Sequence, residues 1–387
     1  MIIKSFLDTD LYKLTMQQAV IQRFPDAVVR YELIIRVQRE FPDGFVTELI
    51  KEIRAMAALR LDEKEREFLK NSCYFFTRPY VDFLAGFCYD PSEVVAEQDG
   101  TDIRLTIEGY WYRTILWEVP LMALISELFF KMTGQEAISY DECSKRLIAK
   151  AVALEKTGAH FADFGTRRRY SLQLQDMAVA ECKVHAPSVF YGTSNPFLAM
   201  KYKCKPIGTQ AHEWYMAIAA MNGYIQANRI GLEEWVNVYN GDLGIALPDT
   251  FTTDTFLSSF NTMYARLFDG VRQDSGNPFE FADKIIEHYK KLKINPLTKT
   301  IVFSDSLNVD TIVKIDQHCK NRVQTSYGIG TNLTNDAGVK PLNMVIKMTA
   351  VKIGDEWLPT VKLSDDPGKH TGDVETVGLC KRILRCK

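Results

Sequence analysis

The chain has 387 residues, of which 46% are hydrophobic and 25% are charged, values typical of a folded globular protein of about two domains. Its formal net charge of -2 argues against electrostatic binding of DNA, RNA or an anionic membrane, which needs clustered lysine and arginine. No apolar run approaches the roughly 18 residues of a membrane span, and acidic residues come too early for a secretion signal. Eight cysteines without C-x-x-C pairs predict reduced thiols and no zinc site. We therefore expect a cytoplasmic protein that binds small molecules.

The first 150 residues predict an α+β unit. Residues 10–24 place apolar side chains at helical spacing, whereas residues 28–37 are rich in β-branched side chains and lead to the turn-forming sequence F-P-D-G. The further elements expected here are helices over 46–59, 63–70 and 121–132 and a strand over 103–111.

From residue 141 the pattern changes to a regular alternation of strands and helices, beginning with an amphipathic helix over 141–156. The expected strands lie near residues 161–165, 189–193, 206–209, 243–248, 268–272, 300–304 and 324–328. Seven parallel strands with right-handed crossovers favour a closed or nearly closed β/α barrel, with an open doubly wound sheet as the alternative. Residues 343–359 predict a β-hairpin that returns to the N-terminal unit. The predicted division is an α+β domain of residues 1–150 plus 342–387 and a barrel-like domain of residues 151–341.

Six short motifs follow these expected strands and precede expected helices: F-G-T-R-R-R, G-T-S-N, G-T-Q-A-H-E-W, G-V-R-Q-D-S-G-N-P, F-S-D-S and Y-G-I-G-T. Barrel enzymes keep their catalytic groups in the loops at the C-terminal ends of the strands. The six motifs are therefore expected to meet at one face of the sheet.

Two of the motifs suit a phosphate group. In Y-G-I-G-T the glycines lack the Cβ that would keep a phosphate from backbone N–H groups, and Thr331 adds a hydroxyl donor. The F-S-D-S motif, on the preceding strand, adds Asp305 and Ser306. An ordinary tight turn is the alternative interpretation of the two glycines.

Two further motifs place a cation beside an acid or an imidazole. Arg272 and Asp274 lie two residues apart and so point to the same side of an extended strand end, where they suit a sugar phosphate or Mg²⁺. A local salt bridge is the alternative. Of the three consecutive arginines in F-G-T-R-R-R, Arg167 is nearest the strand end and best placed to face a carboxylate or pyrophosphate. His212 suits an acid, a base or a nucleophile, and the alternative is a structural histidine.

These strings, with L-D-T-D-L-Y-K-L-T-M near the start and K-L-S-D-D-P-G-K near the end, resemble the nicotinate phosphoribosyltransferase family in order from Leu7 to Lys369. The resemblance implies a type II phosphoribosyltransferase fold, an irregular α/β barrel packed on an open-faced sandwich domain built from both ends of the chain. It also implies a homodimer with a shared active site. The implied reaction, part of NAD salvage, joins nicotinate to 5-phosphoribosyl-1-pyrophosphate, with ATP hydrolysis coupled through a phosphohistidine.

The resemblance assigns roles residue by residue. His212 would be the phosphorylated histidine, and Arg272 and Asp274 would complete the catalytic group. Nicotinate would be bound by Tyr12 of the partner subunit together with Phe164, Arg167, Thr209 and Arg272. The phosphoribosyl group would be bound by Asp305, Ser306, Gly328, Gly330 and Thr331, and Mg²⁺ by Asp274 and Asp305 through the pyrophosphate.

The sequence departs from the family pattern at two positions, where Asn277 and Asn308 replace expected acids. Both changes remove charge near the expected metal. Residues 31–45 also fit the family only loosely.

Three rival functions remain to be weighed. A nicotinamide-using relative would prefer a hydrogen-bond acceptor for the amide, whereas the arginine motif and the H-E-W context favour a carboxylate. A sugar-phosphate aldolase or isomerase would need a base such as lysine at a strand end, and none stands at the expected ends between residues 161 and 328. A non-enzymatic scaffold is opposed by the cost in stability of gathering so many reactive groups at one face.

Overall fold

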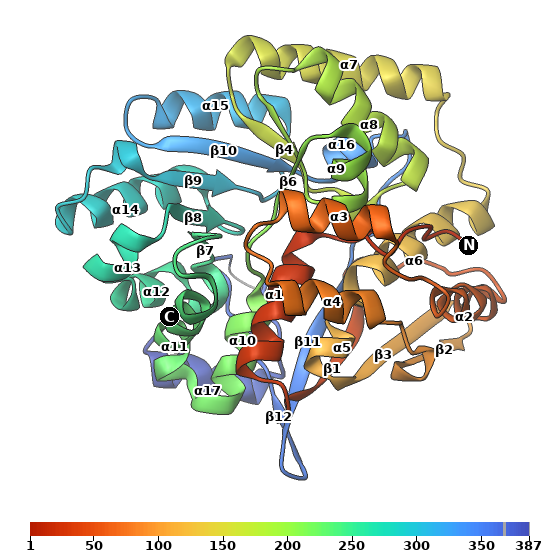
Figure 1. Cartoon of the computed structure of the whole chain (residues 1–387), viewed down its shortest axis with the longest axis horizontal. Helices are drawn as coiled ribbons and strands as arrows, with labels where there is room; N and C mark the ends of the chain where they lie inside the picture. The colour runs from red at the N-terminus through yellow and green to blue at the C-terminus, as the bar shows by residue number, and fades with distance from the viewer. Residues whose placement is uncertain (367–368, 387) are drawn as a thin grey trace.

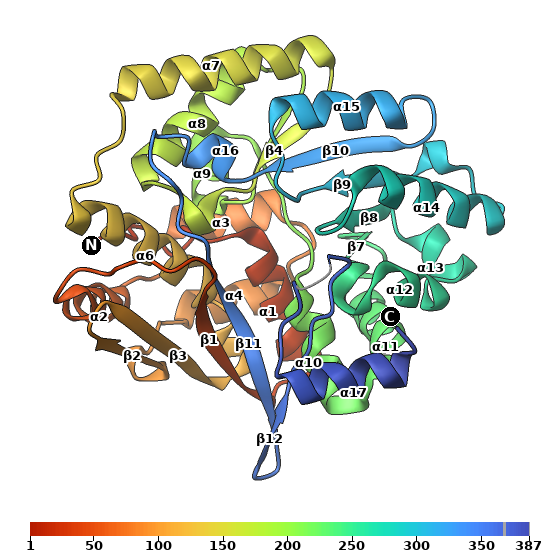
Figure 2. The same ribbon diagram turned by 180° about the vertical axis from the view of Figure 1, so that it is seen from behind.

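The computed structural model describes residues 1–366 and 369–386, which form two β-sheets with helices around and between them (Figure 1). The helices α1 (Leu11–Arg23) and α10 (His212–Asn222) lie between the sheets in the front and back views (Figures 1 and 2). No helix among the described residues combines the length and the apolar character that crossing a lipid bilayer requires.

The first sheet has five antiparallel strands in the order β12-β11-β1-β3-β2. Their bounds are β1 (Val28–Ile35), β2 (Val94–Asp99), β3 (Asp102–Tyr110), β11 (Met344–Ile353) and β12 (Glu356–Pro359). Because β11 pairs with β1, with Leu33 opposite Ile346, the C-terminal hairpin returns to the N-terminal sheet as predicted. Sequence analysis missed β2, a strand with one half-buried and one exposed face and no continuous apolar run.

The second sheet has seven parallel strands in the order β6-β5-β4-β10-β9-β8-β7. They are β4 (Phe161–Asp163), β5 (Phe190–Thr193), β6 (Lys205–Pro206), β7 (Ile245–Ala246), β8 (Gly270–Gln273), β9 (Thr300–Phe303) and β10 (Gln324–Ile329). All seven predicted strands are confirmed, most of them shorter than expected. Each of the six motifs lies at the C-terminal end of one of these strands and leads toward a helix.

Of the two predicted forms, closed or nearly closed, the described residues show a barrel that is not closed. The edge strands β6 and β7 have only two residues each and pair with β5 and β8, not with one another. Between them the chain forms two helices, α10 and α11 (Tyr224–Tyr239). The sheet is therefore a curled half barrel.

The helices predicted from periodicity are confirmed to within a few residues. They are α1, α2 (Phe45–Met56), α3 (Glu63–Ser72), α6 (Glu118–Thr133) and α7 (Tyr140–Thr157). The helix α6 begins before its expected start because Pro120 occupies the first turn, where no backbone N–H is needed. The remaining helices are α4 (Arg78–Gly86), α5 (Trp111–Thr114), α8 (Leu172–His185), α9 (Pro196–Tyr202), α12 (Thr253–Ser259), α13 (Thr262–Leu267), α14 (Pro278–Lys291), α15 (Val309–Cys319), α16 (Thr331–Thr334) and α17 (Val374–Leu384).

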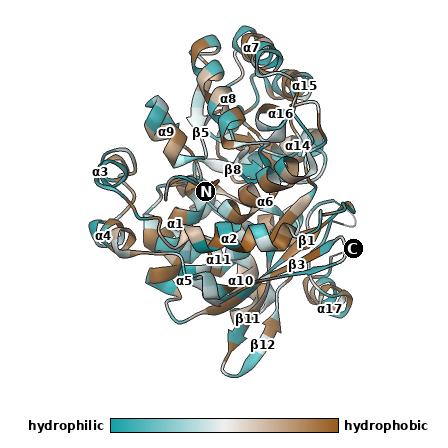
Figure 3. Cartoon of the chain, turned by 90° about the vertical axis from the view of Figure 1, so that its right-hand side faces the viewer, coloured by the Kyte–Doolittle hydropathy of each residue, from teal (hydrophilic) through white to brown (hydrophobic). Residues whose placement is uncertain are grey.

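Buried apolar side chains hold the central helices in place. Figure 3 shows α6 in the middle of the molecule in the brown of hydrophobic residues, with the more hydrophilic α7 at the edge. Trp214 on α10 lies with its ring centroid 6.0 Å from that of Trp111 and 5.7 Å from that of Trp235. Aromatic pairs at such distances add to the stabilisation from burial alone. The helix that begins at His212 is therefore anchored to both α5 and α11.

The helix α17 packs against α11, while β11 belongs to the antiparallel sheet. The C-terminal segment thus contacts both parts of the molecule, and the proposed domain boundaries stay a prediction.

Candidate active site

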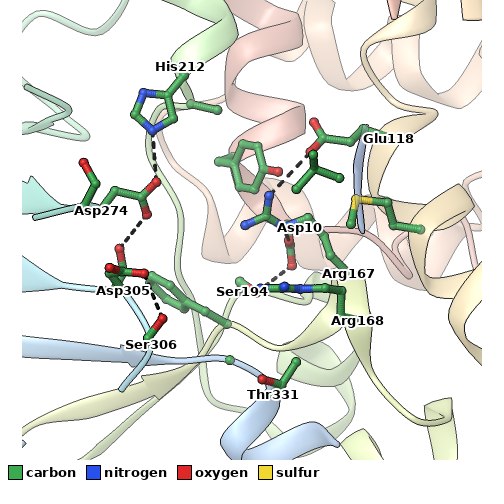
Figure 4. A pocket seen from close by; sticks show the side chains of 18 of the residues that line it. Asp10, Glu118, Arg167, Arg168, Ser194, His212, Asp274, Asp305, Ser306 and Thr331 are labelled. Atoms are coloured by element: carbon green, nitrogen blue, oxygen red, sulfur yellow. Dashed lines mark hydrogen bonds and ion pairs between the residues drawn. The ribbon is translucent and has the colours of Figure 1, made fainter. Parts of the chain in front are cut away.

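A cavity of about 680 Å³ lies where the C-terminal ends of the parallel strands face α1, α6 and β11. All but one of the predicted site residues line it, and Figure 4 shows several of them converging from different elements. These lining residues are Tyr12, Phe164, Arg167, Thr209, His212, Arg272, Asp274, Asp305, Ser306, Gly330 and Thr331. The expectation that the motifs meet at one face is confirmed.

Gly328 is the exception. It is buried in β10 and does not line the cavity, and a Cβ at this position would lie 2.3 Å from Cδ2 of Phe164. The glycine therefore makes room for the Phe164 ring, and its predicted contact with phosphate is wrong.

Tyr12 was predicted to reach the site from the partner subunit. Its ring lines the cavity of its own chain, with the guanidinium carbon of Arg167 5.9 Å from the ring centroid. Helix α1 thus places this ring at the cavity of its own chain, and a contribution from Tyr12 of the partner subunit stays a prediction.

His212 is the first residue of α10 and is nearly buried at the cavity wall. Its Nδ1 lies 3.0 Å from Oγ1 of Thr250, and its Nε2 lies 2.9 Å from Oδ2 of Asp274 (Figure 4) and 2.8 Å from Nζ of Lys362. Burial, and next the Lys362 ammonium, lower the pKa of His212 to about 4, although Asp249 and Asp274 act in the opposite direction. The imidazole is therefore neutral at neutral pH.

The two contacts at Nε2 require opposite tautomers. The Lys362 ammonium can only donate, so it needs the lone pair on Nε2 and leaves the ring proton on Nδ1, where it can be donated to Thr250. The Asp274 carboxylate can only accept, so it needs the proton on Nε2. In the first tautomer Nε2 is a nucleophile, and in the second it is not.

Asp274 is held as an anion by its neighbours. Its Oδ1 accepts a hydrogen bond of 2.9 Å from Ser304 and lies 3.8 Å from Nε of Arg272. Burial raises the pKa of Asp274, but Arg272 and then His212 outweigh burial and hold that pKa well below its usual value. Arg272 donates from Nη1 to the carbonyl oxygen of Gln210 at 3.1 Å, and its buried Nε has no hydrogen-bond partner. A guanidinium has five N–H donors, and among the described residues Arg272 uses one of them in a hydrogen bond, so several donors remain for a ligand.

The three consecutive arginines have three different environments. Arg169 is fully buried and donates to both carboxylate oxygens of Asp8, at 2.6 and 2.8 Å. Arg167 lines the cavity, with Nη1 3.5 Å from Oε1 of Glu118 and Nε 4.0 Å from Oδ2 of Asp10. Arg168 also lines the cavity, and burial followed by repulsion from neighbouring arginines lowers its pKa to about 10. Only Arg169 is a purely structural cation.

The expected phosphate-binding end of the cavity lies at β9 and β10. Ser306 donates to Oδ1 of Asp305 at 3.0 Å, and Nζ of Lys369 lies 3.8 Å from Oδ2 of the same carboxylate. Burial raises the pKa of Asp305, while Lys369 and Ser306 oppose the rise. Gly330 and Thr331 follow β10 and line the same region.

Asn277 and Asn308, where acids were expected, cap helices. The side chain of Asn277 is exposed and accepts from the backbone N–H of Phe279 at 2.9 Å at the start of α14. That of Asn308 accepts from Thr311 at 2.9 Å at the start of α15 and lines the cavity. The replacement of the expected acid by Asn277 therefore leaves the charge of the cavity wall unchanged. The replacement by Asn308 removes a negative charge from that wall.

Sequence analysis missed several polar residues in or behind the cavity wall. Asp249 and Thr250 do not line the cavity, but both are buried behind it against His212. They directly follow the expected strand at 243–248, so the rule that selected Asp274 applies to them equally. Lys362 stands in the K-L-S-D-D-P-G-K string but received no role. Lys347, on β11, reaches the cavity from the other sheet, and burial and then Lys362 lower its pKa to about 8. No local pattern marks Lys347 or Glu118.

One group of side chains has the spacing of a metal site, with ligand atoms of His212, Asp249 and Asp274 within 4.8 Å of one another. The Lys362 ammonium lies beside this group, 3.7 Å from Oδ2 of Asp249. A positive charge is therefore already present there. The group includes Asp274 but not Asp305, the other predicted magnesium ligand.

Comparison with known proteins agrees with this geometry. Residues 159–386 match the nicotinate phosphoribosyltransferase (NAPRTase) family, and residues 7–126 match the NAPRTase N-terminal domain. The chain belongs to the nicotinate phosphoribosyltransferase family.

Relatives in the nicotinate phosphoribosyltransferase family align along almost the whole chain. The enzyme of Chromohalobacter salexigens is 51% identical, covering 98% of each chain, and that of Desulforapulum autotrophicum is 50% identical, covering 99% of each. The crystal structure of nicotinate phosphoribosyltransferase from Porphyromonas gingivalis is similar to this fold with a TM-score of 0.97 at 41% identity, covering 99% of this chain and 100% of that one. The half-barrel sheet and the separate antiparallel sheet are thus the family fold.

Proposed function

We propose that this chain joins nicotinate to 5-phosphoribosyl-1-pyrophosphate, giving nicotinate mononucleotide and pyrophosphate, and that ATP hydrolysis is coupled to this step through phosphorylation of His212. Family membership supports the transferase activity. The observation that carries the coupling is the position of His212, which lines the same cavity as Arg272 and Asp274 and has Nε2 within 3 Å of both Asp274 and Lys362.

The pyridine-binding part of the proposal rests on aromatic and cationic side chains at one end of the cavity. The rings of Tyr12 and Phe164 offer faces on which a pyridine ring can stack. The guanidinium groups of Arg167 and Arg272 can bind the nicotinate carboxylate, which attracts a cation more strongly than a neutral amide does. Nicotinamide is therefore the weaker substrate.

The sugar-binding part rests on the charge of Asp274. Transfer of the ribosyl group develops positive charge at the anomeric carbon, and a preformed anion at that place lowers the barrier. Asp274 and Asp305 offer the oxygen ligands that Mg²⁺ prefers. A bound Mg²⁺ would supply charge neutralisation for the departing pyrophosphate.

The coupling to ATP follows from the two tautomers of His212. In the tautomer with the ring proton on Nδ1, the Nε2 lone pair, once released from its hydrogen bond with Lys362, can attack the γ-phosphorus of ATP, forming an N–P bond as the bond to the β-phosphate oxygen breaks and ADP leaves. The new phosphoryl group brings about two negative charges. These charges attract Lys362 and Arg272 and repel Asp274, so phosphorylation shifts the side chains around the sugar site. Later attack of water on phosphorus restores the imidazole and releases phosphate.

The proposal can be tested with radiolabelled ATP. The purified enzyme is incubated with Mg²⁺ and [γ-³²P]ATP, and acid-labile protein phosphate is measured; nicotinate or nicotinamide and the pyrophosphate donor are then added to follow mononucleotide formation. We expect His212→Ala to lose both the label and the stimulation by ATP. His318→Ala is the matched control, because this histidine is partly exposed and pairs with Asp283 outside the cavity. Retention of ATP stimulation by His212→Ala would contradict the proposal.

The homodimer, the magnesium requirement and the cytoplasmic location stay predictions. Sedimentation of the purified protein tests the first, and activity after treatment with EDTA tests the second.

A further inference from the structure

Behind the cavity wall lies a buried ammonium group that the sequence analysis did not single out. Lys13 on α1 has no exposed surface, and its Nζ contacts Oε2 of Glu118 on α6 and lies 2.9 Å from Oε1 of Glu213 on α10. Both carboxylates are nearly buried as well. Three helices far apart in the sequence therefore meet at one cation.

Each carboxylate also has a neighbour in the proposed active site. Glu118 lines the cavity, and its Oε1 lies 3.5 Å from Nη1 of Arg167, as the dashed line in Figure 4 shows. Glu213 directly follows His212 in the first turn of α10. On one side, the ammonium of Lys13 is thus linked through Glu118 to Arg167, the proposed pyridine-binding cation. On the other side, it contacts Glu213, the residue next to His212.

We propose that Lys13 is a positioning residue that couples the pyridine-carboxylate site at Arg167 to the phosphorylation site at His212, through the shared contacts of its ammonium with Glu118 and Glu213. The inference rests on the proposed roles of Arg167 and His212. It assigns Lys13 no contact with either substrate.

The coupling follows from the balance of charge. Two buried carboxylates share one ammonium, and Glu118 has a second cation in Arg167. When a substrate carboxylate binds Arg167, it competes with Glu118 for that guanidinium. Because a buried charge needs a partner, the ion pair between Glu118 and Lys13 then strengthens. The ion pair between Lys13 and Glu213 weakens as a result. A change at the pyridine site thereby reaches the first turn of α10.

The surroundings of Lys13 keep its ammonium in one place. Its Nζ lies 5.4 Å from the ring centroid of Tyr12 and 5.8 Å from that of Tyr31, distances at which an aromatic face attracts a cation. Burial opposes the charged form of Lys13, but Glu118 and Glu213 outweigh burial, so the pKa of Lys13 is raised and the ammonium stays charged. Because the Tyr12 ring lines the cavity, the same cation also supports the wall against which the pyridine would stack.

Substitution of Lys13 tests the inference through substrate affinity and ATP stoichiometry. Lys13→Met removes the charge and keeps most of the volume, whereas Lys13→Arg keeps the charge. We expect Lys13→Met to raise the KM for nicotinate about tenfold, within the usual range of coupling between sites, and to raise the ATP hydrolysed per mononucleotide formed. Lys13→Arg should recover part of both values. The control is Lys51→Met, since Lys51 is exposed and pairs with the neighbouring Glu48 on the same helix.

A double-mutant cycle separates coupling from a purely structural role. If Lys13 acts through Arg167, the effects of Lys13→Met and Arg167→Met on the KM for nicotinate will be non-additive. Should Lys13→Met fail to fold, Glu213→Gln replaces it, since this change removes one of the two shared carboxylates at nearly constant shape and should likewise raise the ATP consumed per product. A folded variant with unchanged KM and unchanged ATP stoichiometry would overturn the inference. Failure of the proposed function itself would appear elsewhere, as ATP stimulation that survives in His212→Ala.

Discussion

The two walls of the cavity are built in different ways. The wall formed by the parallel sheet carries Arg272, Asp274, Asp305 and Thr331 at the ends of neighbouring strands, within 60 residues of one another in the sequence. The opposite wall carries Tyr12, Glu118, Lys347 and Lys362 on segments from both ends of the chain, and ion pairs such as that of Lys13 with Glu213 hold its helices together.

The comparison separates function from stability. Groups at strand ends are positioned by the sheet itself and by short hydrogen bonds such as that from Ser304 to Asp274, so a substitution there is expected to reduce activity with little effect on folding. Groups that join distant segments carry buried charge, so a substitution there is expected to reduce the stability of the fold.

The largest expected effect is on stability, at the junction between the N-terminal segment and the loop after β4. Arg169→Met leaves the fully buried carboxylate of Asp8 without its bidentate partner and is expected to lower the free energy of unfolding by about 3–5 kcal/mol. Denaturant unfolding measures this loss. Arg146→Met, which breaks only half-exposed ion pairs with Glu142 and Asp336, should cost less than about 1 kcal/mol. Equal losses in the two variants would mean that burial of an ion pair does not set the cost of breaking it.

An effect on activity with little loss of stability is expected at the wall formed by the parallel sheet. Asp274→Asn removes the anion beside the sugar site and should reduce kcat/KM about 100-fold, the scale of a lost electrostatic contact to a transition state. Because Asp274 raises the pKa of His212, the variant lowers that pKa further, so the imidazole stays neutral and changing the pH around neutrality should not restore the rate. Asp254→Asn, at an exposed pair with Lys284, is the control. Recovery of activity on changing the pH would mean that Asp274 acts on protonation and not on the sugar.

The smallest of the three effects tests the corrected role of Gly328. Gly328→Ala forces a Cβ against the Phe164 ring and should cost about 1–3 kcal/mol of stability, the usual range for overpacking. Displacement of the ring should also raise the KM for nicotinate, while the KM for the pyrophosphate donor stays unchanged. Gly86→Ala is the control, since a Cβ there meets no atom within 4 Å. A rise only in the KM for the pyrophosphate donor would restore the original prediction of a phosphate-binding glycine.

Prediction from the sequence succeeded where a local rule applies. Strand periodicity located all seven parallel strands, and the position of each motif after its strand brought Arg167, His212 and Asp274 to one cavity. Asp249 and Thr250 also follow an expected strand and satisfy the same rule, but they were not among the predicted site residues. The rule also predicted that Gly328 faces a phosphate, whereas Gly328 packs against the Phe164 ring. The rule gives the position of a residue along the strand but not the side on which a neighbouring ring packs.

The sequence by itself determined the order of elements, the strand-end chemistry and the family, because each of these depends on short patterns of adjacent residues. Only the tertiary structure decided that the half barrel stays open, that Tyr12 reaches the cavity of its own chain, and that Lys13 lies between Glu118 and Glu213. These features depend on contacts between residues separated by up to 200 positions. Folding removes these charges from water, and each buried charge then needs a partner of opposite sign. That partner can lie anywhere in the chain, so a local pattern does not reveal it.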